Sequence, residues 1–168
     1  MSPKTTFNAT PAEYRFLGVD MRILLTGEET GGQFTMIHGT MPPGGDGGLH
    51  VHAREDESMT MLEGALEVTI GNMTFRLEAG QSYFAPRGIP HRLRNTGSTP
   101  ARSLLVTTPG GFDAFVREAG TPLPLASDRP EQPPTAEQMQ ALMQLAARHG
   151  ITVLEPPSPQ SPASALPI

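Results

Sequence analysis

The chain has 168 residues and a formal net charge of −5, and this length usually corresponds to one domain whose hydrophobic core is large enough to fold unaided. The absence of cysteine excludes disulfides, thiolate metal sites, iron–sulfur clusters and cysteine nucleophiles, and it fits a reducing compartment. Because the sequence has no basic run, no long apolar run and no secretory signal, it indicates a cytoplasmic protein with no nucleic-acid partner and no membrane span.

Short stretches of alternating apolar and polar residues fill the first two thirds of the chain. Residues 13–26 predict one or two strands and residues 33–41 another, after which the composition of residues 42–48 predicts a loop. Gly71-Asn72 separates two alternating runs and predicts a tight hairpin. Such a series of short strands predicts an all-β antiparallel sandwich or barrel. Further strands are predicted within 57–70, broken at Glu63-Gly64, and within 73–79, 80–85, 91–95 and 101–108.

The character of the chain changes after Pro109. Apolar residues at helical spacing predict a helix over 111–119, and Thr135 with Gln138 forms a capping box that begins a second helix. Residues 151–154 predict one more strand. We therefore divide the chain into a barrel with N-terminal strands (1–110), a post-barrel helix (111–120), a proline-rich linker (121–134), a C-terminal helix with a possible strand (135–155) and a flexible tail (156–168).

Three histidines and one glutamate form the most informative set of residues. His50 and His52 are two positions apart, so on a strand both imidazoles point to the same face. Glu57 follows after a short loop, and His91 begins a separate predicted strand. Three imidazoles and a carboxylate suit one divalent transition metal, which is Fe, Mn, Co, Ni, Cu or Zn. Four protein ligands in an octahedral shell would leave positions open for substrate, as in a catalytic rather than a structural site.

These residues lie in two spaced patterns that resemble the two motifs of the cupin superfamily. Every spaced position of both motifs is filled, in order, and the resemblance covers about residues 15–110. The first pattern is Gly44-(five)-His50-x-His52-(four)-Glu57-(six)-Gly64, and the second is Gly80-(five)-Pro86-x-Gly88-(two)-His91-(three)-Asn95.

The resemblance implies a double-stranded β-helix, the cupin jelly-roll barrel, with a metal at its mouth and a C-terminal helical extension. His50, His52, Glu57 and His91 would be the metal ligands. The helix after Pro109 also resembles that of small bacterial proteins like quercetin 2,3-dioxygenase. In relatives that act on flavonols the ligand glutamate accepts the hydroxyl proton of the substrate, so Glu57 would be both a ligand and the catalytic base.

A substrate pocket is predicted beside the metal ligands, although the same apolar residues also fit an ordinary barrel core. Phe34, Met36 and His38 alternate onto one face of their strand, and Arg87 lies in the turn before His91, where it could bind a substrate anion. Methionine adapts to irregular pockets. The remaining predicted pocket residues are Met59, Met61, Phe75 and Tyr83.

The second predicted helix carries an apolar stripe that must be buried on its own barrel or on a second subunit. Cupins commonly pair through sheet edges, which would protect exposed edge strands. We therefore expect a homodimer and a small-molecule substrate. The stripe consists of Met139, Leu142, Met143 and Ala146.

Three functions are consistent with these patterns. The first is a metal-dependent dioxygenase that acts on an aromatic or flavonol-like enol. The second is a non-redox metal enzyme, such as a zinc polyketide cyclase, an isomerase or a lyase, in which the metal polarises a carbonyl group. The third is a cupin that binds a small molecule without catalysis.

Overall fold

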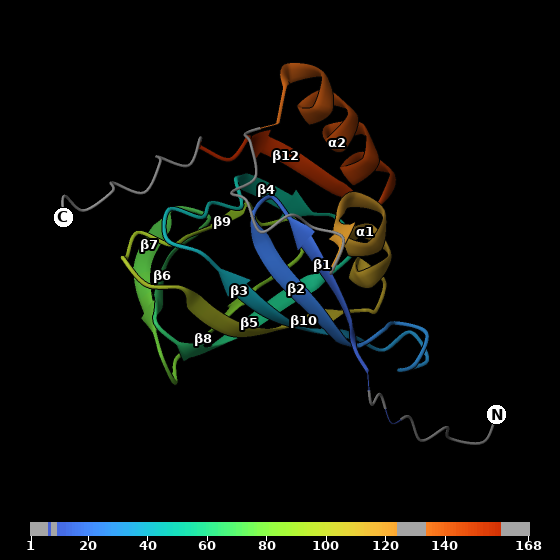
Figure 1. Cartoon of the computed structure of the whole chain (residues 1–168), viewed down its shortest axis with the longest axis horizontal. Helices are drawn as coiled ribbons and strands as arrows, with labels where there is room; N and C mark the ends of the chain where they lie inside the picture. The colour runs from blue at the N-terminus through green and yellow to red at the C-terminus, as the bar shows by residue number, and fades with distance from the viewer. Residues whose placement is uncertain (1–6, 8–9, 124–133, 159–168) are drawn as a thin grey trace.

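Two antiparallel sheets face each other in this computed structural model, which describes residues 7, 10–123 and 134–158 (Figure 1). Most of the predicted linker and most of the predicted tail therefore lie outside the described residues. The seven-stranded sheet has the order β11 (Thr121–Pro122), β1 (Ala12–Phe16), β2 (Val19–Leu25), β3 (Thr35–Met41), β10 (Ala101–Thr108), β5 (Asp56–Glu63) and β8 (Ser82–Ala85). The five-stranded sheet has the order β12 (Ile151–Glu155), β4 (Leu49–His52), β9 (His91–Arg94), β6 (Ala65–Ile70) and β7 (Met73–Glu78).

The strands follow from the alternation in the sequence, and the predicted all-β jelly-roll class is confirmed. Side chains that point inward from both sheets form one core, in which Val68 and Ile37 are almost completely buried. Gly64 ends β5 with a positive φ of 73°, and an added Cβ would lie 3.0 Å from the carbonyl oxygen of Pro100. Glycine is needed there because no other residue adopts that turn so close to a neighbouring backbone.

Two helices follow the barrel strands. Helix α1 (Phe112–Ala119) is fixed by the buried carboxylate of Asp113, which accepts hydrogen bonds from the backbone N–H of Gly27 and the hydroxyl of Thr35. Helix α2 (Ala136–Arg148) begins with the predicted capping box of Thr135 and Gln138. Within the described part of the chain, no helix has the length and apolarity needed to cross a membrane.

The C-terminal segment is built into the barrel. Strand β12 adds to β4 at the edge of the five-stranded sheet, and Figure 1 shows β12 lying between β4 and α2. The residues that flank β12 are held by two hydrogen bonds: the N–H of Ala53 donates to the carbonyl of Gly150 at 2.8 Å, and the N–H of Ser158 donates to the side-chain carboxylate of Asp46 at 2.9 Å. The segment therefore extends the sheet that carries all three histidines of the predicted metal site.

Asp46 connects this segment to β9. Its carboxylate is buried and accepts two hydrogen bonds from the guanidinium of Arg92, at 2.6 and 3.0 Å, and others from the backbone N–H groups of Gly48 and Ser158. Burial alone would raise the pKa of Asp46, but these hydrogen bonds outweigh it and lower the pKa from 3.8 to about 2. Because the pKa is depressed in the folded state, the stabilisation is fully present above about pH 4 and is lost as the pH falls through 2.

We predict that Asp46→Asn lowers the stability of the protein at pH 7, and that the difference from the wild type narrows as the pH falls from 4 towards 2. Urea unfolding followed by circular dichroism at pH 7, 4, 3 and 2 measures this. The exposed Glu78→Gln is the matched control, with little expected change at pH 7. A deficit in Asp46→Asn that is the same at every pH would contradict this role for the carboxylate.

Candidate metal centre

Both sheets contribute to the histidine and glutamate cluster. His50 on β4 and His91 on β9 are direct cross-strand partners, and His52 follows on the same face of β4. Glu57 comes from β5 in the opposite sheet. One donor atom from each of the four residues lies within 4.8 Å of the others. The structure thus brings all four predicted ligands to one point between the sheets, in an arrangement consistent with a single divalent metal site.

Each imidazole is oriented by its Nδ1 atom. The Nδ1 of His50 lies 3.0 Å from the carbonyl oxygen of Gly48, and the Nδ1 of His91 lies 3.1 Å from that of Ile89. Since a carbonyl oxygen only accepts hydrogen bonds, these two Nδ1 atoms carry a proton, and in the neutral form of each ring the Nε2 atom keeps its lone pair. The Nε2 lone pair is the group that a metal ion requires.

Glu55 gives His52 the corresponding support. The carboxylate of Glu55 is buried and lies 3.3 Å from the Nδ1 of His52. A carboxylate behind a metal-binding histidine fixes the ring and increases its basicity. Glu55 was not among the residues predicted from the sequence, although its position three residues after His52 is a signal that the sequence contains.

Two nitrogen atoms in the cluster have no hydrogen-bond partner. These are the Nε2 atoms of His52 and His91, both in side chains that are about 1% exposed. They lie 3.8 Å and 3.5 Å from the carboxylate oxygens of Glu57. Leaving a buried polar atom unsatisfied costs about 1–3 kcal/mol. A divalent cation bound by these atoms would remove that cost, so the residues fit a metal ion.

The charges of the cluster suit a cation. Burial alone would raise the pKa of Glu57, but the nearby imidazoles of His91, His52 and His50 outweigh it and hold that pKa well below its usual range. Burial, together with the neighbouring His91 and His52, lowers the pKa of His50 to about 4. Near neutral pH the site therefore presents an anionic carboxylate and a neutral His50, the forms in which both residues bind metals.

Tyr83 supports the carboxylate ligand. The tyrosine is buried on β8, next to β5, and its hydroxyl donates a hydrogen bond to the Oε1 atom of Glu57. Tyr83 was predicted from the sequence to line the substrate pocket. The structure gives it a contact with a predicted metal ligand instead.

An apolar cavity of about 120 Å³ opens at the cluster. His50, His52 and Glu57 provide most of its polar lining. Phe112 of α1 also lines it, with its ring edge-on to His52 at a centroid distance of 5.3 Å. The remaining walls come from β1, β2, β3, α2, β12 and neighbouring strands, and they include Phe16, Val19, Met21, Met59, Leu93, Leu105, Phe115, Leu142, Ile151 and Val153.

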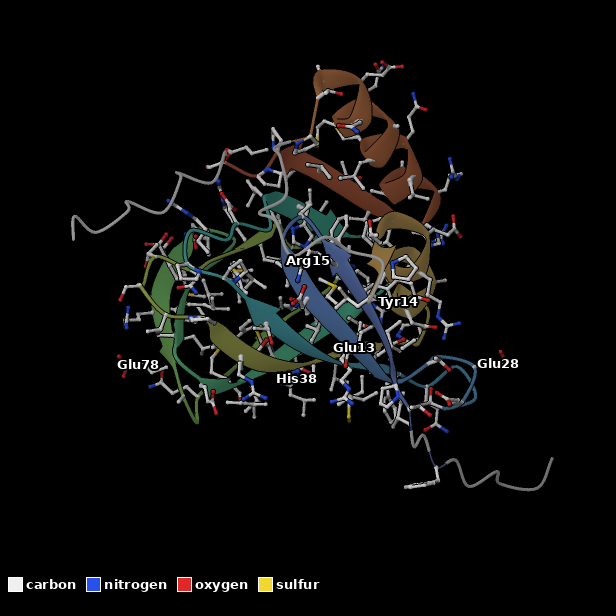
Figure 2. All side chains as sticks on the ribbon, viewed as in Figure 1. Glu13, Tyr14, Arg15, Glu28, His38 and Glu78 are labelled. Carbon is white, nitrogen blue, oxygen red and sulfur yellow. The ribbon has the colours of Figure 1, made fainter. Side chains whose placement is uncertain are left out.

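The inward face of β3 differs from the face that the alternation of its residues predicted. Ile37, Gly39 and Met41 line the cavity, whereas Phe34, Met36 and His38 do not. Both faces of β3 carry apolar residues, so the pattern did not determine which face was inside. His38, which Figure 2 labels, is half-buried and lies near Arg102, Arg22, Glu13 and Glu63.

Three other predicted pocket residues also lie outside the cavity wall. Met61 is buried in the core, and Phe75 packs against that core from β7. Arg87 binds the carboxylate of Asp56 through two hydrogen bonds of 2.8 and 3.0 Å. The hydrogen bonds from Arg87 lower the pKa of Asp56 to about 2. The guanidinium of Arg87 is therefore paired with Asp56, a neighbour in space, rather than directed at a substrate. Of the predicted pocket residues, Met59 lines the cavity.

Comparison with known proteins identifies the family. The cupin domain model matches residues 37–107, and the chain is 32% identical over 112 residues to the polyketide synthase CurC of Streptomyces cyaneus, covering 66% of this chain and 73% of that protein. The chain belongs to the cupin family. Tetracenomycin polyketide synthase protein TcmJ of Streptomyces glaucescens is 32% identical over 93 residues, which are 55% of this chain and 62% of that protein.

The cupin also resembles a regulator and several solved structures. It is 35% identical over 95 residues, 56% of this chain, to the HTH-type transcriptional regulator PuuR of Escherichia coli, but it spans only 51% of that protein. A predicted oxalate decarboxylase from Thermotoga maritima matches with a TM-score of 0.54 and 28% identity over 59% of this chain and 91% of that one. An RmlC-like cupin from Shewanella frigidimarina matches with a TM-score of 0.55 and 21% identity over 67% and 96% of the two chains, which supports the fold alone.

We predict that Glu55→Ala lowers the affinity for zinc by about 10- to 100-fold, because His52 loses the carboxylate that orients it. Competition titration against a chromogenic chelator measures the affinity. His38→Ala is the matched control, because His38 lies outside the cluster, and its zinc affinity should equal that of the wild type. Equal affinities for Glu55→Ala and the wild type would rule out this supporting role.

We predict a smaller loss for Tyr83→Phe, of about tenfold in zinc affinity, because Glu57 loses its hydrogen bond while the aromatic ring stays in place. The same titration measures it, with thermal unfolding as the check on folding. Tyr14→Phe changes the other tyrosine of the chain and should leave zinc affinity unaltered. If both variants bind zinc as the wild type does, the Tyr83 hydroxyl has no part in holding the ligand.

Proposed function

We propose that this cupin is a non-redox, metal-dependent enzyme that acts on a polyketide-type substrate, as a cyclase, isomerase or lyase. The observation that carries the proposal is the buried cluster of three imidazoles and one carboxylate at the end of an apolar cavity. A polyketide is a carbon skeleton with repeated carbonyl groups, so it offers apolar surface to the cavity and oxygen atoms to the cluster.

Two relatives support this choice of substrate class. CurC and TcmJ are both named as polyketide synthase proteins, and the alignments cover 73% and 62% of their lengths. The dioxygenase predicted from the sequence has no comparable support among these relatives and stays a prediction. The likeness to PuuR favours the third function, ligand binding without catalysis, but it covers about half of that regulator.

In the proposed enzyme, different residues would bind the metal, orient the imidazole rings and exclude water. His50, His52, Glu57 and His91 would hold the metal, which would act as a Lewis acid that polarises a substrate carbonyl group. The Nδ1 contacts with Gly48, Glu55 and Ile89 keep the imidazole rings oriented before any substrate arrives. Phe112 and the other apolar walls exclude water, which strengthens electrostatic interactions inside the site.

Glu57 is better suited to be a ligand than a base. Tyr83 donates a hydrogen bond to its carboxylate, and the imidazoles stabilise the ionised form further. Groups that stabilise a carboxylate make it a weaker proton acceptor. We therefore assign Glu57 to metal binding in this proposal, and its predicted role as the catalytic base remains a separate prediction.

We predict that the zinc-loaded protein converts a linear triketone that carries one aromatic ring to a cyclised product, at the same rate in air and under nitrogen. Ultraviolet absorbance and mass spectrometry of the product measure the reaction, and His52→Ala should lower the rate at least 100-fold.

Other outcomes would contradict the proposal in distinct ways. Turnover of a flavonol that consumes oxygen and requires iron, manganese or nickel would favour the dioxygenase. Tight binding of the triketone without turnover would favour a cupin that only binds its ligand. Elemental analysis of protein purified without added metal also separates the proposed enzyme from the dioxygenase, because the proposed enzyme is expected to contain zinc.

A further inference from the structure

One wall of the cavity comes from the C-terminal segment, residues 134–158, which lies beyond the part of the chain that the cupin domain model matches. Leu142 and Met139 of α2 and Ile151 and Val153 of β12 all line the cavity. In the antiparallel register, Ile151 is the partner of His52 and Val153 is the partner of His50. The apolar wall is therefore joined directly to the strand that carries two predicted metal ligands.

This wall is attached along its length. The guanidinium of Arg54 donates to the carbonyl of Arg148 at 3.1 Å where α2 ends, and Arg92 donates to Glu155 at 3.0 Å where β12 ends. The backbone of β12 also approaches Gly48 so closely that an added Cβ there would lie 2.7 Å from the carbonyl oxygen of Glu155. These contacts fix the distance between the wall and the histidines, and with it the width of the cavity.

The size of the cavity limits what can enter. A cavity of about 150 Å³ lined by apolar side chains holds one benzene molecule, and this cavity has a volume of about 120 Å³. Three polar residues of its lining, His50, His52 and Glu57, belong to the cluster, and the residues that α2 and β12 contribute are apolar. A ligand with oxygen donors at one end and a single ring as its body matches both features.

We infer that the α2–β12 wall determines which ligands the site binds, with Leu142 as a selecting residue. The site then accepts a single-ring hydroxyketone or β-diketone in preference to a ligand with several fused or linked rings. This inference rests on the proposed function only in placing the oxygen donors of the ligand at the metal. It concerns which ligands bind, and it does not require turnover.

Two probes with the same chelating group and different bodies test the inference. Maltol has one ring, 3-hydroxyflavone has three, and both bind metals through an adjacent hydroxyl and ketone. Isothermal titration of the zinc-saturated full-length protein gives the affinity for each, divided by the affinity of the same probe for free zinc. We expect the wild type to favour maltol by at least tenfold after this normalisation.

Variants of α2 test whether the α2–β12 wall causes the preference for maltol. Leu142→Ala should reduce the preference for maltol about tenfold by enlarging the cavity, and Leu142→Trp should weaken maltol binding about tenfold by filling it. Met143→Ala is the matched control, because Met143 is the neighbouring residue of α2 but is 41% exposed and does not line the cavity. Its preference should equal that of the wild type.

The inference is overturned if the wild type binds both probes equally after normalisation, or if Leu142→Ala and Met143→Ala have the same preference. Should Leu142→Trp fail to fold, Leu142→Ala still decides the question. Failure of the proposed function looks different, because the protein would then show the predicted size preference and yet convert no triketone.

Discussion

The fold of this cupin depends on one electrostatic constraint: three imidazoles and a carboxylate are buried together between two sheets. His50 and His91 are brought together by strand pairing within one sheet, and Glu57 is contributed by the other. Two of the imidazole Nε2 atoms have no partner among the described residues. A cation held by these residues would satisfy them and would link the two sheets at one point, which would couple metal binding to the stability of the barrel.

The surrounding structure makes this cluster rigid. The carbonyls of Gly48 and Ile89, the carboxylate of Glu55 and the hydroxyl of Tyr83 each hold one of the four side chains. None of these groups is a predicted ligand, yet each restricts a ring or a carboxylate before metal binds. Sites preorganised in this way lose little freedom when the metal or the substrate arrives.

The sequence predicted which four residues form the cluster, because each of them stands at a fixed position in one of two short motifs. His50 and His52 share a face of one strand whatever the rest of the chain does, and the two glycine-rich motifs fix the turns around them. The position of the cavity was harder to predict, because it depends on long-range packing. Both faces of β3 carry apolar residues, so the inward face was chosen incorrectly, and Ile37 rather than His38 lines the cavity.

Ion pairs and strand pairs between residues far apart in the chain were also not predicted from the sequence. Arg87 lies 31 residues from Asp56, and nothing in either local pattern reveals that they form an ion pair. Strand β12 was predicted, but its pairing with β4, about 100 residues earlier in the chain, was not. That pairing turns the C-terminal segment into a wall of the metal site, which is where this cupin extends beyond the cupin domain of its family.

X-ray absorption spectroscopy of the zinc-loaded protein tests the central claim most directly. If the four residues bind one metal ion, the spectrum should show three imidazole ligands at about 2.0–2.1 Å, with oxygen donors completing the shell, at one zinc per chain. His91→Ala should reduce the imidazole count to two. A wild-type spectrum with fewer than three imidazoles, or a count that His91→Ala leaves unchanged, would contradict the account.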